Sequence, residues 1–347
     1  MRRIIALLLL LTVTTVCTSS AAELKKIRAG HIATVEHLLY FVAKDKGFFA
    51  QEGLDVELFR FANSGEGLSA VKAGKLDIGF FGTAAPLLYI AKGAEFTIFG
   101  GGGGEGAALI AKPEKAAHYR SLKNLKGAKI GVVRLATGDV VFRAALREAG
   151  VDWRKDVSFK EFDSPAAVLE AVKKGGLDAG VVWAPFYTMA EKQGLKVAVY
   201  SSDLIKGHTC CRQIALTAKV REHPEDFQKF LVALLRAYKF HQTNRAETVD
   251  IVAKYVQIDK KIIYTSIYDG HMNVDPDPNK KSVVQFWDFM NEVGYLDSKK
   301  HVGDNITTNL YANALVTLQK REPKEILWKA LNKEFRSGEP DLHITKH

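Results

Sequence analysis

Short apolar runs alternate with longer amphipathic stretches from about residue 26 to about residue 219. The short runs are bounded by glycine and polar residues, which is typical of strands buried in a sheet. The stretches between them place apolar side chains on one face of a helix and end near a glycine, as at Gly74. Strands and helices that alternate in this way predict an α/β fold with mostly parallel sheets.

The predicted strands cover residues 26–30, 56–59, 76–81, 96–99, 129–133, 157–162, 179–183, 197–200 and 213–219. The predicted helices between them cover residues 36–46, 64–73, 83–92, 137–149, 165–174 and 184–193. From Pro224 onward the pattern is almost entirely helical, over residues 224–243, 246–256, 260–269, 281–293, 306–319 and 323–335. This helical part is expected to pack on the first group of strands.

The chain contains an internal repeat. Residues 70–79 read A-V-K-A-G-K-L-D-I-G and residues 171–180 read A-V-K-K-G-G-L-D-A-G, so seven of the ten positions are identical at an offset of 101. Chance resemblance between two helix–turn–strand units does not readily give so many identities without a gap. The repeat therefore predicts two similar α/β units of about 100 residues each.

The N-terminus has the layout of a secretory signal peptide. A basic start at Arg2-Arg3 precedes the apolar run 4–13, and Ser20-Ala21-Ala22 offers small residues for a cut before Glu23. An acylated Cys17 and an uncleaved anchor are the alternatives. Because no second apolar run of bilayer length follows, the mature protein is expected in the periplasm or another extracytoplasmic space.

Composition and charge narrow the class of protein. The chain has 347 residues, of which 47% are hydrophobic and 25% charged, as in ordinary globular proteins. The net charge of +10 is spread among acidic residues, so nucleic-acid binding is not expected. Three cysteines do not make a disulfide scaffold. No G-x-S-x-G, H-E-x-x-H or defensible Ser-His-Asp pattern is present, so we expect neither an enzyme nor a cofactor.

A ligand of such a fold is expected at the carboxyl ends of the strands, where the following helices begin. Free N–H groups and the positive dipole end favour an anion there. The loops in question are 30–37, 62–67, 82–85, 134–139, 163–165 and 183–186. The repeat aligns Gly82-Thr83-Ala84 with Trp183-Ala184-Pro185. His31 and His37 fall near the first strand end, where each is either a ligand contact or a surface or capping residue.

Several motifs together resemble a known family. They are V-A-K-D-K-G-F-F-A-Q-E-G-L-D-V-E (42–57), S-G (64–65), A-G-K-L-D-I-G (73–79), V-W-A-P (182–185) and W-D-F-M-N-E-V-G-Y-L (287–296). With the signal peptide, they resemble exported type II solute-binding proteins of ABC transporters, in the taurine, aliphatic sulfonate and nitrate group. The resemblance covers about residues 24–318, and the helical extension beyond about 320 is not usual in the group.

That resemblance implies a two-lobed α/β fold with a hinge, two mostly parallel sheets flanked by helices, and no bond chemistry. Lobe I would comprise 23–105 plus 213–340, and lobe II 106–212. A monomer would close on a small solute and deliver it to the permease of an ABC importer. Residues implied to contact the solute are Ser64, Gly65, Thr83 and Ala84 from lobe I and Thr137, Gly138, Trp183 and Pro185 from lobe II. The strand-end argument adds His37, and we also include His208.

The sequence departs from the group at the lobe II helix start. Ala136-Thr137-Gly138-Asp139 offers a single hydroxyl and an acid, which would repel an anion unless Arg134 offsets it. We expect a small organic solute with an anionic group. A heterocyclic solute such as a pyrimidine precursor, and an enzyme of the same fold, are the alternatives.

Two further segments invite a specific interpretation. His208, Cys210 and Cys211 could be packing or solute-lining residues, a vicinal disulfide, or ligands of zinc or copper. We favour packing or solute lining and expect no metal. The glycine run 100–104 lacks the Lys-Ser/Thr of a nucleotide-binding loop and is interpreted as the hinge.

Overall fold

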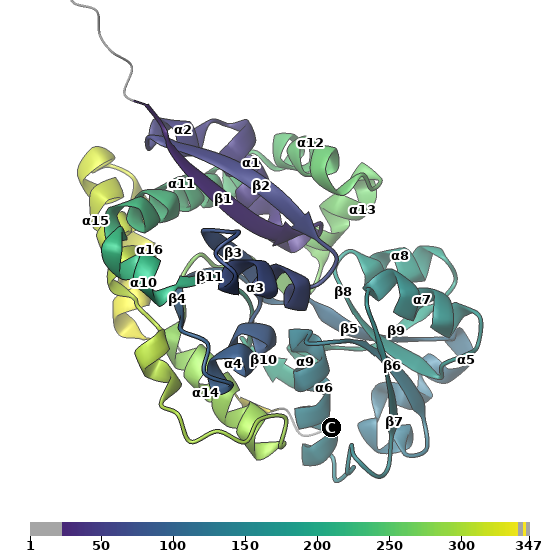
Figure 1. Cartoon of the computed structure of the whole chain (residues 1–347). Coiled ribbons are helices and arrows are strands. Elements are labelled where there is room, and N and C mark those ends of the chain that lie inside the picture. The colour runs from purple at the N-terminus through teal and green to yellow at the C-terminus, as the bar shows by residue number, and fades with distance from the viewer. Residues whose placement is uncertain (1–22, 339–342, 345–347) are drawn as a thin grey trace, which may run out of the picture.

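The structure is a computed structural model that describes residues 23–338 and 343–344. The predicted signal peptide and Cys17 lie outside the described residues. Two β-sheets, each with helices on both faces, lie side by side (Figure 1). Within the described part of the chain, no helix combines the length and apolar character needed to cross a bilayer.

The first sheet has the strand order β12-β4-β11-β3-β1-β2. Strand β1 pairs in parallel with β2 and β3, whereas β11 is inserted between β3 and β4 and is antiparallel to both. The bounds are β1 (Lys25–Ile32), β2 (Leu54–Phe61), β3 (Ile78–Gly82), β4 (Phe96–Glu105), β11 (Thr209–Leu216) and β12 (Met272–Asn273).

The second sheet repeats this arrangement with the order β7-β6-β8-β5-β9. Strand β6 pairs in parallel with β7 and β8, and β5 is inserted antiparallel between β8 and β9. The bounds are β5 (Ala107–Ala111), β6 (Lys129–Val133), β7 (Ser158–Phe162), β8 (Ala179–Trp183) and β9 (Lys196–Tyr200). The short strands β10 (Ile205–Lys206) and β13 (His343–Ile344) pair with each other. Both main sheets are therefore mixed. In the second sheet β5 is antiparallel to its neighbours, and in the first sheet β11, which overlaps the predicted strand 213–219, and β12 run antiparallel to the other strands.

The internal repeat is visible in atomic contacts. An offset of 101 carries β3 onto β8 and α3 (Ser64–Lys72) onto α7 (Pro165–Lys173). A Cβ atom at Gly30 would lie 2.5 Å from Leu76 Cδ1, and one at Gly131 would lie 2.5 Å from Leu177 Cδ1. These two glycine–leucine contacts correspond at the same offset. Each unit thus needs glycine at the point where its first strand (β1 or β6) contacts the leucine that precedes its third strand (β3 or β8).

Helices cover both faces of each sheet. Besides α3 and α7 they are α1 (Leu38–Asp45), α2 (Phe48–Gln51), α4 (Ala84–Ala91), α5 (Pro113–Ala116), α6 (Thr137–Glu148), α8 (Phe186–Lys192) and α9 (Ser201–Leu204). Short 3-10 turns are η1 (Val35–His37), η2 (His118–Arg120), η3 (Leu122–Leu125) and η5 (Val302–Asn305), and η4 (Thr265–Asp269) is a π-helical turn.

The C-terminal part is helical as predicted. It contains α10 (Thr217–Glu222), α11 (Pro224–Thr243), α12 (Arg245–Val256), α13 (Lys260–Tyr264), α14 (Lys280–Glu292), α15 (Asn309–Arg321) and α16 (Ile326–Ser337). Helix α11 packs on α1 and α2 of the first sheet, which confirms the expected packing (Figure 1). The end of α14 also reaches the second unit, because Trp153, in the turn between α6 and β7, donates a hydrogen bond of 3.2 Å from Nε1 to the Val293 carbonyl.

The glycine run 100–104, interpreted from the sequence as the hinge, is part of a strand, and its role in a hinge motion stays a prediction. These residues belong to β4 and pair with β11 and β12. They are glycines because neighbours approach closely: a Cβ at Gly100 would lie 2.5 Å from Leu231 Cδ2, and one at Gly101 would overlap the Asp277 carbonyl. The chain crosses from the first sheet to the second one step later, at Glu105 and Gly106, both with positive φ.

Candidate functional site

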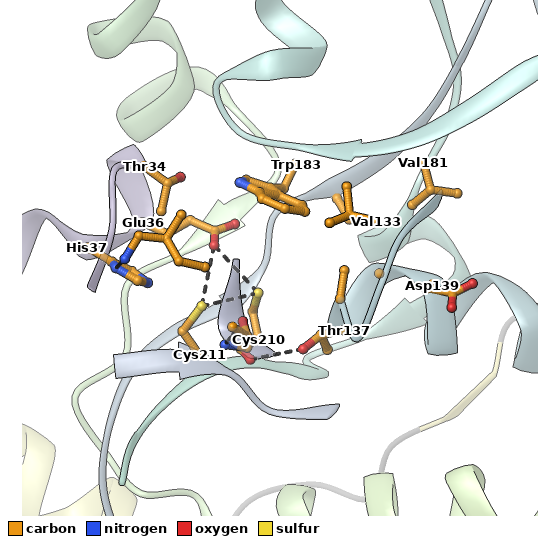
Figure 2. Close-up of a pocket in the computed structure, with 16 residues that line it drawn as sticks. Thr34, Glu36, His37, Val133, Thr137, Asp139, Val181, Trp183, Cys210 and Cys211 are labelled. Carbon is orange, nitrogen blue, oxygen red and sulfur yellow. Dashed lines mark hydrogen bonds between the residues drawn. The ribbon is translucent and has the colours of Figure 1, made fainter. Parts of the chain in front are cut away.

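A cleft lies between the two sheets, at strand ends and helix starts as the sequence predicts (Figure 2). Its lining residues are Ile32, Thr34, Glu36, His37, Ser64, Gly82, Ala107, Val133, Ala136, Thr137, Gly138, Asp139, Val181, Trp183, Cys210 and Cys211. The centre of a water molecule can move through about 40 Å³ of this space. One water needs roughly 10–15 Å³ by that measure, so the cleft admits a small group in this conformation.

The predicted site residues divide into two sets. Five of them line the cleft: His37, Ser64, Thr137, Gly138 and Trp183. The other five, Gly65, Thr83, Ala84, Pro185 and His208, are not among the lining residues. Direct contact with a solute stays a prediction for all ten.

Thr83 is buried in a hydrogen-bond network beneath the cleft. Its backbone N–H and its hydroxyl both donate to the Cys210 carbonyl, at 2.6 and 2.8 Å, and its Oγ1 accepts from the Thr209 hydroxyl at 2.9 Å. The hydroxyl is fully engaged with β11. Thr83 therefore positions the Cys210 backbone and does not face the cavity.

Two hydroxyl residues join the two sides of the cleft. Thr137 Oγ1 donates to the Cys210 carbonyl and accepts from the Ala84 N–H, both at 3.3 Å. On the opposite side, Thr34 Oγ1 donates to the Ala184 carbonyl at 2.7 Å. The bonds of Thr137 join the start of α6, beside the second sheet, to the first sheet. The bond of Thr34 joins the loop after β1, in the first sheet, to the end of β8 in the second. They hold the two walls together without any solute.

Helix α6 begins inside the cleft without a side-chain cap. Its N-cap residue is Ala136, which offers no hydrogen-bonding side chain, and Thr137 and Gly138 follow as lining residues. The first N–H groups of a helix have no intrahelical partner and carry the positive end of the dipole. A Cβ at Gly138 would lie 2.8 Å from Ala107 Cβ, so glycine lets this helix start approach β5 closely.

The acid at this helix start is paired with an arginine of the same helix. Asp139 Oδ1 accepts a hydrogen bond of 2.7 Å from Arg143 Nε one turn later, and both side chains are buried. Burial raises the pKa of Asp139 to about 6, although Arg143 opposes the shift. Arg134, which the sequence offered as a condition for offsetting Asp139, instead lies at the surface beside Glu161 and Asp163.

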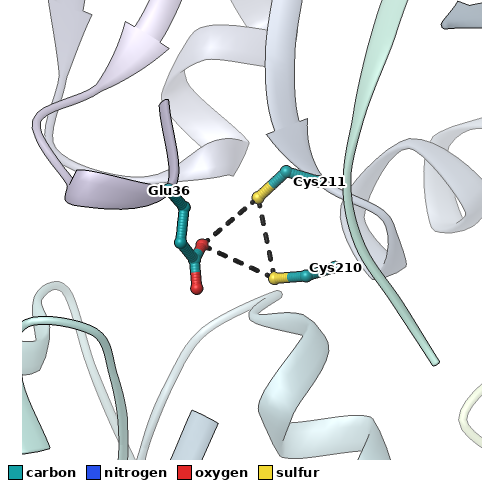
Figure 3. A group of neighbouring side chains, drawn as sticks. All are labelled: Glu36, Cys210 and Cys211. Atoms are coloured by element: carbon teal, nitrogen blue, oxygen red, sulfur yellow. Dashed lines mark hydrogen bonds between the residues drawn. The ribbon is translucent and has the colours of Figure 1, made fainter. Parts of the chain in front are cut away.

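Glu36, Cys210 and Cys211 meet at the opposite wall of the cleft (Figure 3). The two thiols donate to Glu36 Oε2 at 3.6 and 3.5 Å, and the two sulfur atoms lie 3.6 Å apart. The pairing of β11 with β4 shifts register on both sides of Cys211. Successive side chains of a regular strand point to opposite faces, so this irregularity is what lets both sulfur atoms face Glu36.

His208 does not join this group, contrary to the cluster suggested by the sequence. It is buried outside the cleft lining, and its Nδ1 lies 3.1 Å from the Thr209 carbonyl. Burial lowers the pKa of His208 to about 4. Glu36 takes its place in the group, and burial raises the pKa of Glu36 to about 8 against the effect of the two thiols.

Sequence reasoning missed Glu36 and Thr34 as lining residues. Both fall in the loop 30–37 that the strand-end argument selected, but only its histidines were singled out. Of these, His37 lines the cleft and stacks on Phe80 at 4.1 Å between ring centres, whereas His31 lies outside the lining. The sequence did show a carboxylate in that loop, that of Glu36. Its contact with Cys210 depends on β11, which lies far away in sequence.

Several curated relatives are similar over most of this chain. A binding protein of Brucella abortus is 28% identical over 274 residues, covering 78% of this chain and 84% of that protein. A Bacillus subtilis protein named as an aliphatic sulfonates-binding protein is 25% identical over 309 residues, covering 84% of this chain and 89% of that protein.

Solved structures share the fold. The periplasmic aliphatic sulphonate binding protein SsuA from Escherichia coli has a TM-score of 0.70 at 20% identity, over 83% of this chain and 99% of that one. The periplasmic nitrate-binding protein NrtA from Synechocystis PCC 6803 has a TM-score of 0.76 at 18% identity, over 86% and 90%. The fold is thus that of periplasmic binding proteins. The model of the NMT1-like family matches residues 20–257, and the chain belongs to that family.

Proposed function

We propose that this protein is the exported solute-binding component of an ABC importer. It captures a small organic solute with an anionic group, of the sulfonate or nitrate type, and presents it to a membrane permease. The observation that carries the ligand class is the uncapped start of α6, whose first residues line the cleft between the sheets. An anionic oxygen placed there would accept hydrogen bonds from the free N–H groups and lie at the positive end of the helix dipole.

The relatives support the importer role. Their names describe binding proteins, among them binders of aliphatic sulfonates and of nitrate. The cleft charges are compatible with an anion, because Asp139 is paired with Arg143 and the raised pKa of Glu36 keeps most of that carboxyl neutral at pH 7. Only one hydroxyl, that of Thr137, stands at the start of α6, so backbone N–H groups would carry much of the recognition.

Capture would proceed by rotation of two lobes about the connections between the sheets. The proposed lobes are residues 23–105 with 213–340 and residues 106–212, except that β11 (Thr209–Leu216) pairs within the first sheet, which moves residues 209–212 to the first lobe. The first connection is Glu105–Gly106, and the return passes Gly207, which also has positive φ. Opening would break the hydrogen bonds that Thr34 and Thr137 make across the cleft, and solute binding would favour the closed form.

Solute binding can be tested by isothermal titration calorimetry with taurine, alkanesulfonates and nitrate, each added to the purified protein. We expect one of these anions to bind at one site per chain and to raise the melting temperature. Thr137→Val removes the hydroxyl that bonds the Cys210 carbonyl and the Ala84 N–H across the cleft, so the closed form loses these bonds and solute binding should weaken about tenfold.

Arg134→Ala is the matched control, since Arg134 lies outside the cleft and its loss should leave the affinity unchanged. If none of the anions binds, or if Thr137→Val leaves the affinity unchanged while Arg134→Ala lowers it, the proposed ligand class is wrong.

A further inference from the structure

Glu36, Cys210 and Cys211 form a triangle of donor atoms with nearly equal sides (Figure 3). Glu36 Oε2 lies 3.6 Å from Cys210 Sγ and 3.5 Å from Cys211 Sγ, and the two sulfur atoms are 3.6 Å apart. The three groups come from the loop after β1 and from β11, which are far apart in sequence. The fold therefore gathers two thiols and one carboxyl at a single point of the cleft wall.

The dimensions of this triangle match one face of a tetrahedral zinc site. With Zn–S bonds of about 2.3 Å and a Zn–O bond of about 2.0 Å, tetrahedral angles place two sulfurs about 3.8 Å apart and a sulfur and an oxygen about 3.5 Å apart. The observed separations differ from these by about 0.2 Å or less, which is within the tolerance expected of a metal site. Ligand movement on binding would be small.

Burial makes this cluster costly to leave without a partner. Glu36 is 3% exposed, and its second oxygen, Oε1, has no hydrogen-bond partner among the described residues. That oxygen sits against Gly106, where any Cβ would overlap it. A cation in the triangle would be bound by Oε2, not by Oε1, and would offset the cost of burying the carboxylate charge.

We propose that Glu36, Cys210 and Cys211 bind one thiophilic metal ion of the Zn²⁺ class in the cleft. Thiolate and carboxylate ligands suit this class, and three protein ligands leave a fourth position open, as in catalytic zinc sites. Because all three residues line the cleft, the open position faces the cavity. Water or a donor atom of a bound solute completes the coordination.

Binding of the metal releases protons. Each thiol gives up its proton to form a thiolate, and the carboxyl gives up its own if it is protonated, so two to three protons pass to the solvent for each ion bound. No electron moves and no oxidant is required. The site with a divalent ion carries a net charge of about −1, which favours a neutral donor at the fourth position.

Metal binding can be measured on the reduced protein with no organic solute present, using Cd²⁺ as the probe. We expect a thiolate-to-cadmium charge-transfer band in the ultraviolet that saturates at one equivalent per chain and is displaced by Zn²⁺. Cys210→Ser and Cys211→Ser should each weaken binding about 100-fold or more, and Glu36→Gln about 10-fold or more, because each removes a ligand.

Two controls separate this site from other metal-binding groups. His208→Gln should leave the band and the affinity unchanged, because His208 is not part of the triangle. A second group, of the exposed His223 and Glu225 and the buried Asp226, also brings metal-ligand atoms together, but it contains no sulfur and gives no such band. His223→Gln should therefore leave the band intact.

Thiol alkylation followed by mass spectrometry tests the same site in the unmodified sequence. With the protein lightly unfolded to expose both thiols, bound metal should slow the alkylation of Cys210 and Cys211 at least about tenfold, and a chelator should restore it. The proposal is overturned if no band appears, if the band survives Cys210→Ser and Cys211→Ser, or if the freshly purified cysteines form a disulfide that reduction does not convert to a metal site.

The test of the metal site is independent of the test of solute binding. Metal binding without any anion binding would overturn only the proposed ligand class, and anion binding without a metal band would overturn only the metal site.

Discussion

The two walls of the cleft include the ends of β1 and β6, which correspond in the repeat, but they carry different chemistry. The wall on β11 and the loop after β1 presents two thiols and a carboxyl, from Cys210, Cys211 and Glu36. The wall on β6 and β8 presents mainly apolar surface, from residues such as Val133 and Trp183. The scaffold is duplicated down to individual glycine contacts, so the difference arises at the strand ends and in the inserted strand. The two units therefore share one scaffold, and a few residues at the strand ends make the two cleft walls chemically different.

The two walls also treat a buried acid differently. Asp139 on the second wall has Arg143 within its own helix, and that guanidinium lies 4.4 and 4.0 Å from the ring centres of Trp153 and Phe159. Glu36 on the first wall has thiols as neighbours and no ion pair among the described residues. Asp139 is therefore part of a buried ion pair that stabilises the fold. Glu36 is instead held with a raised pKa, which a bound cation would change.

The largest effect is expected from breaking the ion pair of the second wall. Asp139→Ala leaves the buried Arg143 charge without its partner and should lower the free energy of unfolding by about 3–5 kcal/mol. Urea denaturation followed by circular dichroism measures it. The double variant Asp139→Ala/Arg143→Met should recover most of the loss. Glu292→Ala, which removes the exposed partner of Arg147, should cost less than about 1 kcal/mol. Equal losses for Asp139→Ala and Glu292→Ala would contradict the assignment.

The duplicated scaffold can be tested at a matched pair of glycines. A Cβ at Gly79 would lie 2.5 Å from Phe81 and 2.9 Å from Val71, and one at Gly180 would overlap Val168. Gly79→Ala and Gly180→Ala should each lower the free energy of unfolding by about 1–3 kcal/mol through overpacking.

Gly176→Ala is the control for this pair. Its nearest neighbour would be the Ala171 carbonyl at 3.5 Å, and the repeat places Lys75 at the equivalent position. We expect a change within about 0.5 kcal/mol in either direction. A loss at only one of Gly79 and Gly180 would mean that the two units are packed differently.

The acid of the first wall predicts a pH dependence of stability. Glu36 has a pKa of about 8 when folded and an ordinary value near 4.5 when unfolded, so folding keeps a proton that the unfolded chain has lost. Stability should therefore fall as the pH rises between these values, by at most about 1.4 kcal/mol per pH unit. His208, with a lowered folded pKa, acts in the opposite direction below about pH 6.5.

The informative window is thus pH 6.5–8, where the loss should total at most about 2 kcal/mol. Urea denaturation in the presence of a chelator would show this slope in the wild type and its absence in Glu36→Gln. A slope that persists in Glu36→Gln would assign the titration to another group.

The smallest effect is expected outside the cleft. Arg134→Ala removes only exposed ion pairs with Glu161 and Asp163, so its effect on the free energy of unfolding should stay below about 0.5 kcal/mol. The same denaturation measurement checks it. A loss of 2 kcal/mol or more would mean that Arg134, rather than Arg143, supports the start of α6.

Much of the fold followed from periodicity and the repeat. The strands 129–133 and 179–183 and the helix 224–243 coincide with β6, β8 and α11. Strand β5 was missed because Ala107-Ala108 has no strong strand preference, and its place between β8 and β9 depends on tertiary pairing. The predicted strand 96–99 stopped short of the glycine run in β4, because the reason for these glycines, the close approach of Leu231 and the Asp277 carbonyl, is also a tertiary contact.

The site was located in outline but not in composition. Strand-end reasoning selected the loops that contain His37, Ser64 and Trp183, all of which line the cleft. It could not place Glu36 beside Cys210, because the register irregularity of β11 that aims both sulfur atoms at one carboxyl is not visible in a local pattern. A group of side chains that is assembled by contacts between distant segments could not be predicted from the sequence.

The insertion of β11 in the middle of the first sheet constrains the order of folding. All of the second sheet, β5 to β9, is made between β4 and β11, so that sheet can form from one continuous segment. The first sheet has to wait for residue 216 before β11 can join β3 to β4, and α11, which packs on α1 and α2, is made later still. Long loop closure slows such pairing. The segment synthesised first is therefore expected to be the last to reach its native state.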